Sequence, residues 1–266
     1  MGTLYAMSDI HGFYDLMLRN LEYLDLSEPG TRLIFCGDYV DGGTDGCRVL
    51  YKIKELTERY PLQVVALKGN HETMFLDFLE AGELDIVNVA WAAIQLTDAI
   101  GYNFLSATCR EKLRDFDFPT DDLDVLFRAA RIVQKDILEN HKDLVQWMKH
   151  LPYYYETETQ IFVHAGINEE AGNRWKQATS EDDFVNKYPA SFGKFYKDII
   201  AGHIATSSLA GDPDFHGVFW DKQSHYYIDG TAGISHCIPL LKYDTEKREY
   251  TAIRITENQI HAEPIV

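Results

Sequence analysis

The sequence predicts an α/β fold for this chain of 266 residues. Short apolar runs alternate with amphipathic helical segments near the N-terminus, which is the pattern of parallel strands joined by helices. A mostly helical stretch follows, and the C-terminal tail alternates apolar and polar residues as antiparallel strands do. Because this length suits one large α/β domain, we expect a single domain over residues 1–266.

Six short apolar runs are typical of buried strands, and most are bounded by Gly, Asn, Asp or His. They cover residues 3–7, 32–35, 63–67, 160–164, 198–202 and 225–229. Two segments with apolar residues at helical spacing separate the first three runs, at residues 13–24 and 47–60. Strand, helix and strand in succession predict a sheet with right-handed crossovers.

The middle and the end of the chain have different patterns. Residues 73–150 are mostly helical, which predicts a helical insert. Its longest stretch runs from Thr120 to His150, with Thr120 as the expected N-cap and two aspartates suited to the first turn. Residues 238–266 alternate around the turns "DTEK" and "TENQ" and predict antiparallel β-hairpins.

The charge balance limits the classes of partner. The chain has 25 basic and 42 acidic side chains, a net charge of −17, with 45% hydrophobic residues. Such a field repels polyanions, so we expect no general binding to nucleic acid. A phosphate ester remains compatible as a substrate if bound metal reverses the field locally.

The cysteines and the N-terminus predict a protein of a reducing compartment. Cys-x-x-Cys pairs are absent from the sequence, so we expect four buried free thiols at Cys36, Cys47, Cys109 and Cys237. The N-terminus has no basic region before a long apolar stretch, and no window is long enough to span a bilayer. We therefore expect a cytoplasmic protein with no membrane partner.

Side chains that can bind metal follow each of the first five predicted strands. The carboxyl ends of parallel strands meet at one edge of a sheet, so these groups could gather in space. A lone His, or an Asp before Gly, is usually an ordinary turn or loop residue, but five such cases at successive strand ends favour a metal site. The groups are Asp9 and His11, Asp38 and Asp41, Asn70 and His71, His164, and His203.

The types of donor indicate the type of metal. Imidazole, carboxylate and amide donors without thiolate suit Mn²⁺, Fe or Zn²⁺. A carboxylate such as Asp38 can offer one oxygen to each of two ions. We expect two divalent or trivalent ions, Mn and/or Fe, with Zn as the alternative.

Five segments in order carry a resemblance to a known family. The segments "SDIHG", "GDYVDGG", "LKGNHE", "VHAGI" and "AGH" resemble the signatures of the calcineurin-like metallophosphoesterases, specifically of their phosphoprotein phosphatase branch. They also resemble the symmetrical dinucleoside tetraphosphatases. The resemblance spans residues 9–203 and implies two mixed β-sheets sandwiched between helices.

The resemblance also implies a role for each matching residue. The first metal would be held by Asp9, His11 and Asp38, and the second by Asp38, Asn70, His164 and His203. His71 would be the general acid, and Asp41 would orient it. The implied reaction is hydrolysis of a phosphomonoester, with protein phosphoserine or phosphothreonine as a candidate substrate, by direct attack of metal-bound hydroxide.

Two departures from the family pattern keep the substrate open. Gly42 and Lys68 stand where the family has arginines associated with the substrate phosphate. Lys187 and Arg174 are candidates for the replacement cation, as is Lys68 itself. The alternatives are hydrolysis of a dinucleoside polyphosphate or another small phosphorylated metabolite, and a binding module that has lost catalysis. The sequence leaves the oligomeric state open.

Overall fold

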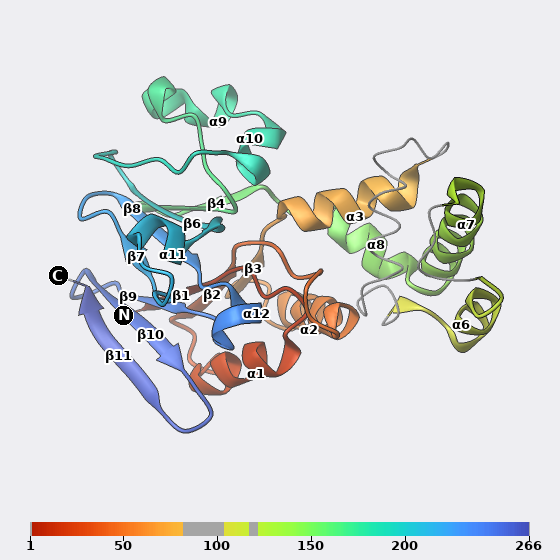
Figure 1. Cartoon of the computed structure of the whole chain (residues 1–266). Coiled ribbons are helices and arrows are strands. Elements are labelled where there is room, and N and C mark those ends of the chain that lie inside the picture. Colours follow the sequence, from red (N-terminus) through yellow and green to blue (C-terminus); the bar gives the residue numbers. More distant parts are fainter. Residues whose placement is uncertain (1, 82–103, 117–121, 266) are drawn as a thin grey trace.

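The structure is a computed structural model that describes residues 2–81, 104–116 and 122–265. It contains two mixed β-sheets with helices outside them, so the predicted fold class is confirmed (Figure 1). The first sheet has the strand order β11-β10-β9-β1-β2-β3. Its strands are β1 (Thr3–Met7), β2 (Thr31–Phe35), β3 (Val64–Ala66), β9 (Leu240–Asp244), β10 (Glu249–Ile255) and β11 (Ile260–Ile265).

Parallel pairing sets the end of the first sheet at which the site lies. Strands β1, β2 and β3 are parallel, with Met7 beside Phe35 and Phe35 beside Ala66. The loops that follow these three strands therefore start from the same edge. Strands β9, β10 and β11 extend the sheet as two antiparallel hairpins at its other side.

The second sheet has the order β4-β5-β6-β8-β7, and its three central strands are parallel. An irregularity between Ala201 and Ala205 interrupts the pairing of β6 with β8. A bulge of this kind re-aims side chains, and His203 lies within it with φ 66°. The strands are β4 (Tyr154–Glu156), β5 (Gln160–Val163), β6 (Asp198–Ala205), β7 (Phe219–Trp220) and β8 (His225–Asp229).

The two sheets pack face to face over an apolar layer. Leu4 and Ile34 of the first sheet belong to the same buried cluster as Phe162, Ile200 and Ile228 of the second. The outer face of the first sheet is covered by α1 (Tyr14–Tyr23) and α2 (Gly46–Arg59), whose buried residues join its outer core. The helices near the second sheet are short: η1 (Glu169–Arg174), α9 (Trp175–Ala178), α10 (Glu181–Asn186) and α11 (Thr206–Ala210). The short α12 (Ala232–Ser235) instead contributes Ala232 to the outer core of the first sheet.

Helices occupy the described part of residues 70–149, where the sequence predicts an insert. They are α3 (Asn70–Glu80), α6 (Ala107–Leu113), α7 (Leu123–Asn140) and α8 (Lys142–Lys149), and they project to one side of the sheets in Figure 1. The insert predicted for residues 73–150 stays a prediction as a structural unit, because residues 82–103 and 117–121 lie outside the described part.

The helical stretch predicted from Thr120 to His150 is helical over most of its described part, but it forms two helices and not one. The chain breaks at His141, which ends α7 with φ −123°. The ring of His141 bonds the hydroxyl of Tyr51 at 2.8 Å and the carbonyl of Phe104 at 2.8 Å, so tertiary contacts override helical spacing here. Asp122 is the N-cap of α7, and Thr120 lies outside the described residues.

Two predictions made from the sequence concern the state of the cysteines and the presence of membrane-spanning helices. All four cysteines are free and buried, as predicted. Burial raises the pKa of Cys47 to about 11, so its thiol is neutral at ordinary pH. In the described ranges, we find no helix with the length and hydrophobicity needed to cross a bilayer.

Truncation of a residue between the sheets tests the packing of this layer. Ile34 is fully buried, so we expect Ile34→Ala to lower the free energy of unfolding by about 2–5 kcal/mol through lost apolar burial and a cavity. Urea unfolding measures the change. The matched control is Ile260→Ala, whose side chain is 58% exposed and whose loss should matter far less. Equal effects of the two substitutions would contradict the packing described.

Candidate metal centre

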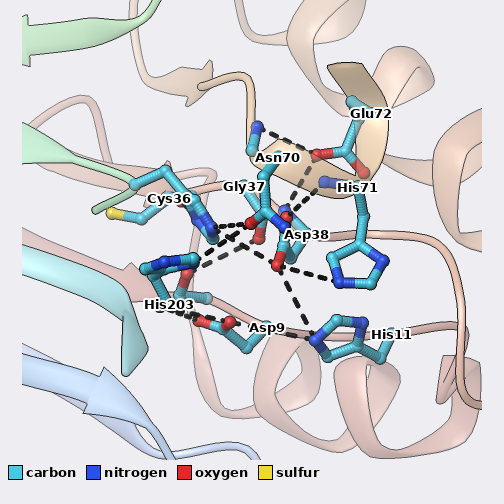
Figure 2. Close-up of polar contacts among 12 residues, drawn as sticks. Asp9, His11, Cys36, Gly37, Asp38, Asn70, His71, Glu72 and His203 are labelled. Atoms are coloured by element: carbon cyan, nitrogen blue, oxygen red, sulfur yellow. Dashed lines mark hydrogen bonds and ion pairs between the residues drawn. The ribbon is translucent and has the colours of Figure 1, made fainter. Parts of the chain in front are cut away.

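The six predicted ligands meet at one point between the two sheets. Figure 2 shows Asp38, which follows β2, at the middle of the group. Its Oδ2 lies 3.3 Å from Nε2 of His164 and 3.8 Å from Nε2 of His11. The Oδ1 atom of Asn70 lies 2.8 Å from Nε2 of His164 and 3.1 Å from Nδ1 of His203. Side chains from five separate segments of the chain are thus brought into contact.

Asp9 joins this group through the backbone of the second sheet. Its carboxylate accepts the backbone N–H of His203 at 3.2 Å, and its Oδ1 lies 3.8 Å from Nε2 of His11. Burial and then the charge of Asp229 raise the pKa of Asp9 to about 7. The loop after β1 is therefore linked directly to β6 at the site.

Two imidazoles are oriented by backbone carbonyls. Nδ1 of His164 lies 2.8 Å from the carbonyl oxygen of Cys36, and Nδ1 of His11 lies 2.9 Å from that of Val40. A carbonyl only accepts, so Nδ1 carries the proton in both rings, and in a neutral ring Nε2 presents its lone pair. Both lone pairs then face the carboxylate of Asp38, an arrangement that a cation or a proton must stabilise.

Without a cation, protons take its place in this cluster. Burial opposes the charging of His164, but the charge of Asp38 and its hydrogen bond prevail and raise the pKa of His164 to about 10. Burial and the neighbouring His164 lower the pKa of His203 to about 4. The pKa values of these two neighbouring imidazoles thus shift in opposite directions, because a positive charge on one ring disfavours protonation of the other.

Two sets of donor atoms lie close enough together to hold an ion. Within each set, the ligand atoms are all within 4.8 Å of one another. Asp38 belongs to both, as a carboxylate shared between two ions would. The sets are His11, Asp38 and His71, and Asp38, His164 and His203. The donors therefore fit metal ions, and the first set includes His71, for which the sequence predicts another role.

Strained backbone holds these side chains. Asp9, His11, Asp38, Asp41 and His203 all have φ between 46° and 68°, the left-handed region that residues other than glycine rarely adopt. Each such residue costs about 1–3 kcal/mol and persists only where the surrounding structure enforces it. The surrounding structure therefore holds these five residues in a conformation that they would not adopt on their own.

Glu72 is the main restraint on two of these loops, and the sequence analysis missed it. This fully buried carboxylate accepts the backbone N–H of Tyr39 at 2.7 Å, of Asp38 at 2.9 Å and of Gly69 at 3.0 Å. A Cβ at Gly69 would lie 2.2 Å from Oδ1 of Asp38, so only glycine allows this approach. The "GNHE" segment, in which Glu72 follows two assigned residues, was the available signal.

Asp229 is a second acidic residue that the sequence analysis missed. It ends β8 and is 8% exposed. Burial raises its pKa, and its charge acts on Asp9 and His11. The rule that polar groups at strand ends gather at one edge would have included it, because "HYYID" was a predicted strand.

His71 and Asp41 form a close pair beside the ligands. Nδ1 of His71 lies 2.6 Å from Oδ2 of Asp41, and Nε2 lies 3.8 Å from Oδ2 of Asp38. Burial disfavours the charged ring, but the hydrogen bond with Asp41 and the charge of Asp38 raise the pKa of His71 to about 9. A protonated imidazole whose second nitrogen faces the site can donate a proton there.

Of the three predicted substrate cations, two donate to backbone carbonyls and the third is exposed. Nζ of Lys68 donates to the carbonyl of Lys149 at 3.1 Å, and burial lowers the pKa of Lys68. Nζ of Lys187 donates to Ile167 O at 2.5 Å and to Ser191 Oγ at 2.7 Å. Arg174 is exposed on η1. Their role in phosphate binding stays a prediction.

The conformation at Gly42 explains why an arginine does not fit there. Gly42 has φ 106°, and an added Cβ would lie 3.3 Å from Cβ of His11. A residue with a side chain would be strained in this conformation. An arginine at position 42 would therefore require a different backbone conformation of this loop.

Comparison with protein-family models identifies the family of the chain. Residues 2–229 match the model of the calcineurin-like phosphoesterases. The chain belongs to this family. Membership implies divalent metal ions, which the two donor sets fit.

Two curated relatives show partial similarity. The chain is 42% identical over 66 residues to the catalytic subunit of serine/threonine-protein phosphatase 6 from Drosophila melanogaster, over 24% of this chain and 21% of that protein. It is 38% identical over 79 residues to a symmetrical bis(5′-nucleosyl)-tetraphosphatase from Legionella pneumophila (strain Lens), over 30% of this chain and 27% of that protein. The matched segments thus span about a quarter of each relative.

A solved structure extends the similarity in fold to nearly the whole chain. The cold-active protein-tyrosine phosphatase of a psychrophilic Shewanella species superposes with a TM-score of 0.56 at 15% identity. The superposition covers 98% of this chain and 80% of that one. At this identity the likeness concerns the fold.

Removal of the charge on Glu72 tests its role in holding Asp38. We expect Glu72→Gln to weaken Mn²⁺ binding at least about tenfold, since outer partners of metal ligands typically contribute this much. It should also lower the free energy of unfolding by about 2 kcal/mol, because an amide cannot accept all three N–H groups. Titration calorimetry measures the affinity. Glu80→Gln, an exposed change on the same helix, is the control, and unchanged Mn²⁺ affinity in Glu72→Gln would refute this role.

His225 gives a pH-dependent contribution to stability away from the ligands. Its Nδ1 lies 2.8 Å from Asp221 Oδ2, and its Nε2 lies 3.0 Å from Glu169 Oε2. Burial opposes charge on the ring, but the hydrogen bonds and charges of Glu169 and Asp221 raise the pKa of His225. The charged ring therefore stabilises the fold fully below its unfolded pKa of about 6.5, and this contribution is lost as pH rises through the folded-state pKa.

We expect His225→Gln to destabilise the protein more at about pH 6 than at about pH 9. Urea unfolding at both values measures the difference between the variant and the wild type. The exposed His150→Gln is the matched control and should show no such pH dependence. A constant difference across this range would show that the buried ring is not charged.

Proposed function

We propose that this protein is a metal-dependent phosphoesterase that hydrolyses phosphomonoesters. The observation that carries the proposal is the convergence of His11, His164 and His203 on the shared carboxylate of Asp38, with the His71–Asp41 pair beside it. Family membership supports the same reaction class. A module without catalysis would have no use for a complete donor set and an adjacent proton donor.

Two ions would be held by the six predicted ligands, with Asp38 between them. When bound, they supply a nucleophile by lowering the pKa of water and stabilise the charge that develops on the phosphoryl group. Mn and Fe suit these donors, and Zn is the alternative. Asp9 and Asn70 bring anionic and neutral oxygen to the site, and Glu72 holds the backbone from which Asp38 projects.

His71 is the proposed general acid. Its raised pKa keeps the ring protonated at neutral pH, and Asp41 holds the proton on Nδ1, so Nε2 can donate its proton to the leaving oxygen. The aspartate also fixes the orientation of the ring. His71 lies at the first turn of α3, which starts directly at the ligand Asn70.

The substrate is proposed as a phosphomonoester, with phosphoserine or phosphothreonine in protein as one class. A second candidate is a dinucleoside polyphosphate or another small phosphorylated metabolite. The specific observation in its favour is Gly42, whose backbone conformation excludes the arginine associated with phosphoprotein phosphatases. Similarity to a symmetrical bis(5′-nucleosyl)-tetraphosphatase supports the same candidate.

A substrate panel with the Mn²⁺-loaded protein tests both candidates. We expect turnover of p-nitrophenyl phosphate that is abolished by EDTA and restored by Mn²⁺. The kcat values for a phosphoserine peptide and for diadenosine tetraphosphate then separate the substrate classes. Rapid dinucleotide cleavage with negligible peptide turnover would reject the protein-phosphatase candidate.

The proposed acid has its own test. His71→Ala should lower kcat by about 10²–10⁴-fold, because general acid catalysis contributes this much. Asp41→Asn should lower kcat less and change the pH profile, since the ring loses its anionic partner. His150→Gln controls for loss of a surface histidine. Full activity of His71→Ala would rule out the role assigned to this residue.

A further inference from the structure

The hydroxyl of Tyr39 lies between the ends of β2 and β3, close to the proposed metal ligands. Tyr39 directly follows Asp38 and is fully buried. Its ring packs in the outer core of the first sheet, edge-on to Phe35 with 6.3 Å between the ring centroids. A phenylalanine would fill this space without burying a polar atom, so packing alone does not account for the hydroxyl.

The hydroxyl connects the two strand ends through backbone groups. It donates to the carbonyl of Leu67 at 2.6 Å and accepts the N–H of Gly37 at 3.2 Å. The carbonyl oxygen of Phe35 lies 3.2 Å from the hydroxyl and accepts the N–H of Leu67 at 2.8 Å. A single oxygen atom therefore joins the chain that leaves β2 to the chain that leaves β3.

Both joined segments are in contact with ligands proposed for the second ion. The carbonyl oxygen of Cys36, at the end of β2, lies 2.8 Å from Nδ1 of His164, and Asn70 begins α3 shortly after β3 ends. A Cβ at Gly37 would lie 2.8 Å from Nδ1 of His164 and 2.8 Å from Cα of Gly69, so these segments touch one another. Figure 2 shows Cys36 and Gly37 beside the ligands. A shift of either segment would therefore move donor atoms of the second ion.

We propose that Tyr39 is a positioning residue for the second metal ion, and that its hydroxyl sets the distance between Asp38 and Asn70 and the orientation of His164. This inference rests on the proposed metal centre. Groups that orient metal ligands typically contribute about 10- to 100-fold in metal affinity. Glu72 already holds the two loops through their N–H groups, and the hydroxyl adds a second connection at the strand ends themselves.

The bonds of this hydroxyl favour an effect on one ion rather than on both. Asp9 and His11, the proposed ligands that only the first ion uses, lie on the loop after β1. In the part of the chain that the structure describes, the hydroxyl bonds the ends of β2 and β3 and not this loop. The ring of His11 is oriented by the carbonyl of Val40 instead. Loss of the hydroxyl should therefore weaken the second ion and largely spare the first.

The test is Tyr39→Phe, which removes the hydroxyl and keeps the ring. The full chain is stripped of metal with EDTA and titrated with Mn²⁺ by calorimetry, which measures the affinities of both ions. We expect the affinity of the second ion to fall about 10- to 100-fold and that of the first to stay largely unchanged. Mn²⁺ EPR is a second readout: the signal of a spin-coupled pair in the wild type should become that of an isolated ion in the variant. The variant should fold, because one buried hydrogen bond is a small part of the stability of a domain.

Three further variants assign the affinities and control for lost stability. His203→Gln removes a proposed ligand of the second ion and His11→Gln one of the first, and Tyr39→Phe should reproduce the pattern of His203→Gln. The matched control is Tyr227→Phe, because Tyr227 is 3% exposed and its hydroxyl donates to the carbonyl of Ser191 at 2.7 Å. This control loses a similar buried bond and should keep both Mn²⁺ affinities.

Two results with Tyr39→Phe would overturn the proposal. One is an equal loss of affinity for both ions, which would show a general loosening of the site. The other is a pair of affinities like those of Tyr227→Phe, which would show that the hydroxyl contributes to stability alone. In both cases the metal centre itself would stand, since the wild type still binds two Mn²⁺ ions. A wild-type chain that binds fewer than two ions would overturn the proposed centre and this inference together.

Discussion

The burial of one carboxylate, that of Asp38, is the constraint on which the rest of the site depends. This side chain is 2% exposed between two sheets, where an uncompensated negative charge would be very unfavourable. The surrounding imidazoles lower its pKa, although burial acts in the opposite direction. The chain therefore has to bring positive charge to Asp38, as protons on its histidines or as bound cations, and the loops around it are arranged to do so.

That arrangement costs stability, which other parts of the fold must supply. Five residues of the site have left-handed backbone, and two of them, Asp9 after β1 and His203 within β6, link the two sheets through a hydrogen bond. Glu72 joins the loops after β2 and β3 through backbone N–H groups. The apolar layer between the sheets holds the strands from which these loops start. Packing thus provides the rigidity that the strained loops lack on their own.

The region around the metal centre differs from the family pattern in its cations. Lys68 and Lys187 donate to backbone carbonyls, so both ammonium groups have structural contacts. The position of Gly42 cannot present an arginine in its present conformation. The two lysines that the sequence suggests as phosphate-binding cations thus already make structural hydrogen bonds.

The sequence by itself predicted the fold class and named candidate ligands that the structure brings close together. A polar residue directly after an apolar run is recognisable in a short stretch of sequence. Parallel strands bring such residues to the same edge of a sheet, whatever the length of chain between the strands. It could not show that His141 divides the long helical stretch, because that break depends on bonds to Tyr51 and Phe104. Only the tertiary structure decided that Glu72 holds the backbone of Asp38 and that His71 belongs to one of the two donor sets. Each of these depends on where distant backbone atoms come to lie, and a pattern of residue types carries no such distances.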